Sequence, residues 1–82
     1  MSAKSIENLE ELCMSFLRKA FTYADAETAE HFKTCDVIDY HHTVGQDLRN
    51  AYIWESVDVL GNEHADDFSN RMLKKFQGTL HD

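Results

Sequence analysis

The chain has 82 residues, of which 43% are hydrophobic, 11% aromatic and 28% charged, and its formal net charge is −7. The length fits one small domain over residues 1–82 and excludes a multidomain enzyme, while the composition excludes both a disordered chain and a membrane span. The negative charge argues against direct binding to DNA or RNA, because it repels phosphate groups.

The first predicted helix begins at Ile6, with Ser5 as its N-cap. Arg18 and Lys19 near its end complement the helix dipole. Cys13 lies within its apolar stripe, so we expect a buried, unreactive thiol there. The stripe follows spacings of three and four residues and consists of Ile6, Leu9, Leu12, Cys13, Phe16, Leu17, Ala20 and Phe21.

Two further helices are predicted in the first two thirds of the chain. Asp25 caps a short helix that ends at about Phe32, and Asp36 caps a longer one that continues to Tyr52. Gly45 within the longer helix costs about 1 kcal/mol relative to alanine, so we expect close packing at that point. The apolar face of this helix consists of Val37, Tyr40, His41, Val44, Leu48, Ala51 and Tyr52.

A hydrophobic connector over residues 53–60 is expected to lie on the core before a turn at Gly61 and Asn62. The last predicted helix starts near Asp66 and has an apolar stripe of Phe68, Met72, Leu73, Phe76 and Leu80. The expected fold is an all-α bundle of three or four helices. The first and last helices pack on the helix that ends at Tyr52.

A set of polar and small residues recurs in a recognisable order in the second half of the chain. It reads Tyr40-His41-His42, Gly45, Leu48-Arg49-Asn50 and Trp54, followed by His64-Ala65-Asp66-Asp67-Phe68-Ser69. This order resembles a family of small uncharacterised bacterial and phage proteins, a domain of unknown function. The family has the pattern His-His-x-x-Gly-x-x-(Ile/Leu)-Arg-Asn-x-x-x-(Leu)-Trp, followed by His-Pro-Asp-Asp-x-Ser. The resemblance covers about Asp36 to Leu80, with Ala65 in place of the proline, and implies a helical fold in a bacterial or phage setting without any assigned catalytic role.

These polar residues are interpreted as a structural network. Arg49 is one of only two cations between Asp25 and Asp67, so we expect it to pair with Asp66, Asp67 or a helix C-terminal carbonyl. We expect Trp54 to close the core, with its indole N–H on a carbonyl. The alternative is a binding surface built from the same side chains. The predicted network consists of His41, His42, Arg49, Asn50, Trp54, His64, Asp66 and Asp67.

Metal and catalytic sites are not expected. His41, His42, His64, Asp66 and Asp67 are suitable ligand types, but adjacent histidines on a helix point about 100° apart. The sequence contains no Gly-x-Ser-x-Gly motif, no phosphate-binding glycine loop and no Cys-x-x-Cys pair. A metal-dependent hydrolase and a cysteine nucleophile are therefore minor alternatives, and no cofactor is predicted.

The acidic charge is concentrated in the middle of the chain. Eleven acids and two bases between Asp25 and Asp67 give that stretch a net charge of −9. It either keeps a small protein soluble or attracts a basic protein partner. For the second case we expect partner contacts through Glu27, Glu30, Asp36, Asp39, Asp47, Glu55 and Asp58.

Three hypotheses on function and location follow. The preferred function is a non-catalytic inhibitor that occupies the basic nucleic-acid groove of a host protein, such as a defence nuclease, because the resemblance includes phage proteins. The alternative is a self-assembling structural module in which exposed aromatic residues form a homodimer. The N-terminal residues show no secretory signal, so we expect the cytoplasm of a bacterium or of a phage-infected host.

Overall fold

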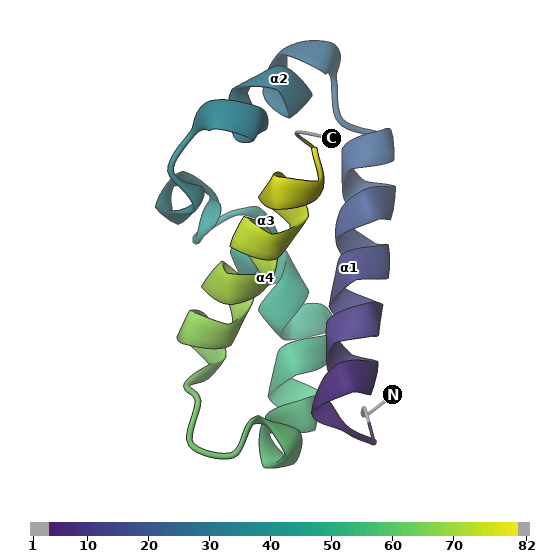
Figure 1. Cartoon of the computed structure of the whole chain (residues 1–82), viewed down its shortest axis with the longest axis vertical. Helices are drawn as coiled ribbons and strands as arrows, with labels where there is room; N and C mark the ends of the chain where they lie inside the picture. The colour runs from purple at the N-terminus through teal and green to yellow at the C-terminus, as the bar shows by residue number, and fades with distance from the viewer. Residues whose placement is uncertain (1–3, 81–82) are drawn as a thin grey trace.

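The computed structural model describes residues 4–80, and every regular element in that part of the chain is helical (Figure 1), which confirms the all-α prediction. The terminal residues of the predicted domain, 1–3 and 81–82, lie outside the described residues. The elements in chain order are α1 (Ile6–Thr22), α2 (Ala26–Thr34), the 3₁₀ helix η1 (Val37–Tyr40), α3 (Val44–Leu48), the π-helical η2 (Arg49–Ile53), the 3₁₀ helix η3 (Trp54–Leu60) and α4 (Ala65–Thr79).

The caps predicted for the first two helices are present. The Ser5 hydroxyl accepts a hydrogen bond from the Asn8 backbone N–H at 3.1 Å, so α1 begins where predicted. The Asp25 carboxylate accepts from the Thr28 N–H at 2.7 Å, and hydrogen bonding to the Thr28 side chain and, second, to its backbone lowers the pKa of Asp25. α2 continues two residues beyond its predicted end at Phe32, whose ring is fully buried.

The predicted helix from Val37 to Tyr52 is wrong as a single element. Asp36 caps only the 3₁₀ turn η1, by accepting from the Ile38 N–H at 3.1 Å. The chain then turns over residues 41–43, and Thr43 leaves the helical region with φ −112° and ψ −95°. A second helical run starts at Val44 and passes through α3, η2 and η3. Because of this break, the His41 carbonyl is not used in a backbone hydrogen bond of a continuous helix, and it can accept a hydrogen bond from a side chain.

The helical run over residues 44–60 changes its hydrogen-bonding pattern twice. In the π segment the Trp54 backbone N–H bonds to the carbonyl of Arg49, five residues earlier. Ser56, with φ −119° and ψ 22°, kinks the 3₁₀ segment, and Gly61 ends it with φ 65°. The hydrophobic connector was predicted as either a helical turn or an irregular loop, and it is helical, continuing from α3.

α4 supplies a large part of the core. It starts at Ala65, one residue before the predicted start, and the His64 ring nitrogen caps it by accepting from the Asp66 N–H at 3.1 Å. α4 runs beside α1 in roughly the same direction (Figure 1), and both contact the helical run over residues 44–53 as predicted. Its buried residues are Ala65, Phe68, Ser69, Met72, Leu73 and Phe76.

Candidate functional site

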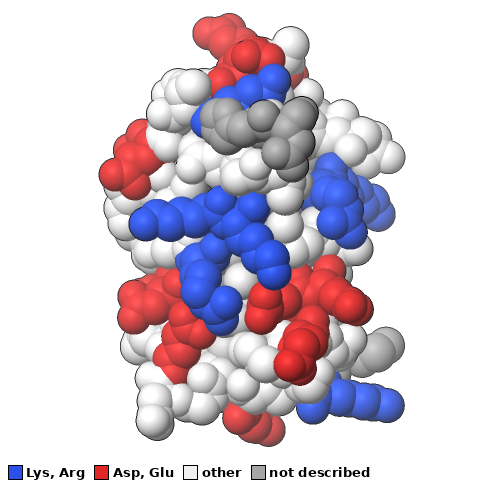
Figure 2. Space-filling model, in the orientation of Figure 1, with Lys and Arg blue, Asp and Glu red and all other residues white. Residues whose placement is uncertain are grey.

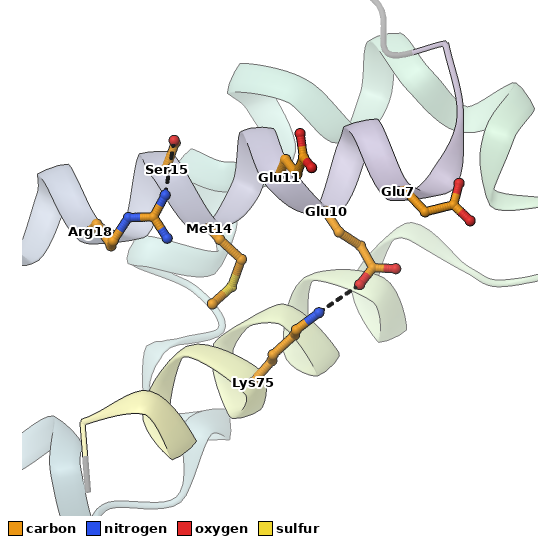
Figure 3. Close-up of a pocket in the computed structure, with 7 residues that line it drawn as sticks. All are labelled: Glu7, Glu10, Glu11, Met14, Ser15, Arg18 and Lys75. Carbon is orange, nitrogen blue, oxygen red and sulfur yellow. Dashed lines mark hydrogen bonds and ion pairs between the residues drawn. The ribbon is translucent and has the colours of Figure 1, made fainter. Parts of the chain in front are cut away.

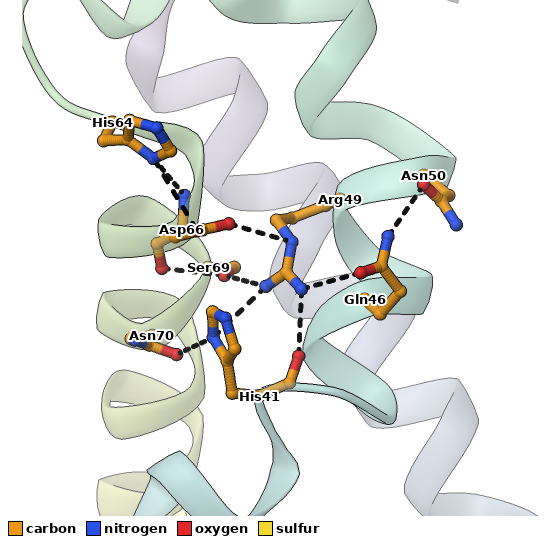
Figure 4. Close-up of polar contacts among 8 residues, drawn as sticks. All are labelled: His41, Gln46, Arg49, Asn50, His64, Asp66, Ser69 and Asn70. Carbon is orange, nitrogen blue, oxygen red and sulfur yellow. Dashed lines mark hydrogen bonds and ion pairs between the residues drawn. The ribbon is translucent and has the colours of Figure 1, made fainter.

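Arg49 is the centre of the polar cluster between the 44–60 helix and α4 (Figure 4), and it is only 2% exposed. Its Nη1 donates to the Ser69 hydroxyl at 2.8 Å. Its Nη2 donates to the His41 carbonyl at 3.0 Å and to Gln46 Oε1 at 3.1 Å. Its Nε lies 3.3 Å from Asp66 Oδ1, which is the ion pair that the shortage of cations predicted. A buried guanidinium costs free energy unless its donors are bonded, and here every edge of the group has an acceptor.

His41 and Ser69 complete this cluster. His41 Nδ1 lies 3.0 Å from Asn70 Oδ1 and 3.4 Å from Arg49 Nη1. Nδ1 of His41 thus lies between the Asn70 side-chain amide and the Arg49 guanidinium. The Ser69 hydroxyl accepts from Arg49 and donates to the Asp66 carbonyl at 2.9 Å. The cluster therefore ties the turn after η1 to the first two turns of α4.

Glycine 45 is required beside this cluster, which bears out the packing expected there. A Cβ atom at Gly45 would lie 3.2 Å from the Tyr40 carbonyl oxygen and 3.3 Å from Arg49 Nη1. Both distances are shorter than ordinary van der Waals contact. Gly45 thus lets the helix approach the end of η1 closely enough for Arg49 to reach the His41 carbonyl.

Several residues of the predicted network lie outside the cluster. His42 is exposed and touches only the edge of the His41 ring, with centroids 4.8 Å apart. Asp67 is exposed, and Asn50 is joined to the cluster only through the Gln46 side-chain amide, at 3.1 Å. His64 acts as the cap of α4.

The prediction that Trp54 closes the core is wrong, because its side chain is 48% exposed while that of Ile53 is fully buried. The π turn before Trp54 is the physical reason. A five-residue hydrogen bond adds a residue to one turn and changes which side chain faces inward, so that Ile53 rather than Trp54 lies in the core.

Sequence reasoning missed three members of the cluster: Gln46, Ser69 and Asn70. Ser69 had a detectable signal, since it lies four residues before Leu73 on the apolar stripe of α4. A polar residue at a buried position indicates a hydrogen-bonding partner in the core. Gln46 and Asn70 carry no comparable signal because each lies at the half-buried edge of its helix.

The seven carboxylates predicted for partner binding are all exposed, but they do not gather in one patch. Glu27 and Glu30 lie on α2, at one end of the long axis, and η3 lies toward the other end (Figure 1). Asp36 and Asp39 belong to η1 and its cap. The other three, Asp47, Glu55 and Asp58, lie on the 44–60 helix.

The two thiols are free and Cys13 is fully buried, as predicted. Burial raises the pKa of Cys13 to about 12, and the nearby carboxylate of Glu10 adds to the effect. A thiol with this pKa holds almost no thiolate at neutral pH, so Cys13 is a poor nucleophile. Within residues 4–80, no three side chains of His, Cys, Asp or Glu approach one another closely enough to hold a metal ion.

The arrangement around Arg49 suits a structural role. Over residues 4–80, every buried side-chain nitrogen and oxygen has a hydrogen-bond partner. Two surface hollows lie against α1, and no residue of the Arg49 cluster lines either of them. No helix in the described part of the chain has the length and apolar character needed to cross a bilayer.

No known family model, no curated protein and no solved structure matches the chain. The resemblance to the bacterial and phage family therefore stays a prediction. The function has to be argued from the geometry of the surface.

Proposed function

We propose that this chain is a small helical protein-binding protein whose acidic surface docks on a basic surface of a partner. Its centre is the outer side of the 44–60 helix, which we call the acidic docking surface. This surface consists of Asp47, Trp54, Glu55, Val57 and Asp58, all of them exposed.

The observation that carries the proposal is the exposure of two apolar side chains among these carboxylates. Trp54 is 48% exposed and Val57 is 45% exposed, three residues apart on one helical segment. An acidic surface that serves only solubility has no use for an exposed tryptophan. Tryptophan is the residue type most enriched among the side chains that dominate protein interfaces, and carboxylates around it steer a basic partner toward it.

Charge and length together favour a nucleic-acid-binding protein as the partner. Glu27, Glu30, Asp36 and Asp39 add further exposed negative charge on α2 and on η1 and its cap, apart from the docking surface. The long dimension of the molecule, 36 Å, matches about one turn of B-form DNA, roughly 34–36 Å. The protein would then compete with nucleic acid for a basic groove, and a host defence nuclease is the form of partner that we prefer.

The test is an affinity capture from bacterial lysate with matched variants. The wild-type chain, Trp54→Ala and Asp47→Asn/Asp58→Asn are compared with two controls. Tyr23→Ala removes an aromatic side chain that is 81% exposed on another part of the surface, and Asp67→Asn removes an exposed carboxylate on α4. We expect one basic protein to be retained by the wild type and both controls, and lost with Trp54→Ala and with the double variant.

A competition step tests the groove itself. Short duplex DNA added to the captured complex should release the partner, because both ligands would occupy the same basic surface. A partner that stays bound at saturating DNA contradicts occupation of the groove. If Tyr23→Ala and Trp54→Ala weaken binding of the partner to the same extent, the acidic docking surface is not the binding site.

A further inference from the structure

The surface formed by α1 and α4 differs in charge from the rest of the molecule. The first half of α1 carries Glu7, Glu10 and Glu11, and the second half carries Arg18 and Lys19. Figure 2 shows basic side chains gathered across the middle of this face, with acidic side chains below them. The charges here are nearly balanced and separated along the helix, whereas residues 25–67 carry −9. Two copies of this acidic protein therefore repel each other least when they approach through this face.

The exposed side of α1 is also hollowed along one line of residues (Figure 3), and we call this line the α1 stripe. The hollow has a volume of about 640 Å³, and Lys75 of α4 lines its other side, bonded to Glu10 at 3.0 Å. Met14, which is half-buried, gives its centre an apolar contact. Spacings of three and four residues place the α1 stripe on one helix face, and it consists of Glu7, Glu11, Met14, Ser15 and Arg18.

The charges of the stripe have few partners within the chain. Among residues 4–80, Glu7 and Glu11 form no ion pair, and Arg18 only donates from Nη2 to the Ser15 hydroxyl at 3.3 Å. By contrast, Glu10 already pairs with Lys75 and Arg71. Within residues 4–80, the Glu11 carboxylate has no ion-pair partner and the Arg18 side chain bonds only Ser15, so both charges can pair with another molecule.

We propose that a second copy of this chain docks on the α1 stripe, with the two α1 helices antiparallel. A two-fold axis between Met14 and Ser15 places Glu11 and Arg18 at equal distances on either side of it. Glu11 of each protomer then faces Arg18 of the other, and the two methionines meet near the axis. This is a self-complementary interface, in which the same patch serves both copies. It uses none of the residues of the acidic docking surface, so each dimer presents two such surfaces to partners and gains avidity from them.

The symmetry allows a test by mixing charge-reversed chains. Glu11→Lys alone places two lysines opposite two arginines, and Arg18→Glu alone places two glutamates opposite two glutamates. We expect each single variant to dimerise at least about tenfold more weakly than the wild type in sedimentation equilibrium. An equimolar mixture of the two variants forms two attractive pairs, one native Arg18–Glu11 pair and one with its polarity reversed, so we expect a heterodimer of about wild-type affinity.

The matched control is Glu27→Lys, which changes the net charge as Glu11→Lys does but lies exposed on α2. It should leave dimerisation unchanged, and melting curves of all variants should stay within a few degrees of the wild type because the replaced side chains are exposed. The proposal is overturned if the wild type is monomeric up to about 1 mM, if Glu27→Lys acts like Glu11→Lys, or if the mixture stays monomeric. The charge-reversed variants keep Trp54 and the rest of the acidic docking surface. A loss of dimers can therefore be observed separately from a loss of partner binding.

Discussion

Replacing Arg49 by methionine tests the role of the buried polar cluster. The substitution keeps the length and apolar stem of the side chain but removes a charge that is 2% exposed. Three acceptors lose their donor: the His41 carbonyl, Gln46 Oε1 and Asp66 Oδ1. The Ser69 hydroxyl keeps its own bond to the Asp66 carbonyl, so its loss is small.

The expected cost follows from how far water can reach these acceptors. Removing one partner of a fully buried ion pair costs about 3–5 kcal/mol. The Asp66 side chain is 47% exposed and regains water, which moves the estimate to the lower end, about 3 kcal/mol. A chain of this length has a total stability of about 4–12 kcal/mol, so the variant should lose a large part of it. Its Tm should fall by about 12–24 °C.

Arg71→Met is the comparison variant, because Arg71 also pairs with carboxylates, those of Glu63 and Glu10, but at the surface. Its side chain is 46% exposed, and it donates to Glu63 at 3.0 and 3.1 Å. An exposed pair of this kind contributes below about 1 kcal/mol. Urea unfolding followed by circular dichroism at equal protein concentration gives both values. Equal losses of unfolding free energy in the two variants would refute the reasoning, because the larger loss expected for Arg49→Met depends on the burial of Arg49.

Three further outcomes are expected. Gly45→Ala should lower the unfolding free energy by about 1–2 kcal/mol, because its Cβ meets a backbone oxygen at 3.2 Å, whereas Gly78→Ala, in open space, should raise the Tm. The pKa of Asp25 in the folded protein lies below the ordinary value of 3.8, so the stabilisation from its cap should be present at neutral pH and be lost as the pH falls below 3.8 through the folded-state pKa. The difference in Tm between Asp25→Ala and the wild type should therefore shrink in melts at successively lower pH. Iodoacetamide should modify Cys35 in the folded protein and reach Cys13 only after urea is added, as mass spectrometry would show.

The helices with local signals could be predicted from the sequence. Ser5 and Asp25 accept the capping bonds that their positions indicated, and the buried residues of α1 fall on the predicted stripe. Caps and stripes depend on residues within a few positions of one another, so a single sequence contains what is needed to find them. Asp66 was one of the three partners predicted for Arg49, because one of only two cations within an acidic stretch is expected to pair with a nearby acceptor.

The region from Asp36 to Leu60 could not be predicted because its form depends on distant residues. The break at residues 41–43 allows the His41 carbonyl to bond Arg49, and that guanidinium is in turn held by Ser69 on α4. The π turn then shifts the helix face and exposes Trp54. The expectation for Trp54 rested on the burial that is usual for an aromatic side chain, so it placed Trp54 in the core and overlooked the apolar part of the acidic docking surface.

α4 follows the other described helices along the chain, and this order affects how the protein folds during synthesis. Phe68, Met72, Leu73 and Phe76 of α4 fill the space between α1 and the 44–60 helix. During synthesis the earlier helices leave the ribosome with this apolar space unfilled, and they cannot complete a core until the 15 residues of α4 arrive. A nascent chain arrested before α4 should therefore bind chaperones, whereas a chain that includes α4 should allow all the helices to fold in one cooperative step.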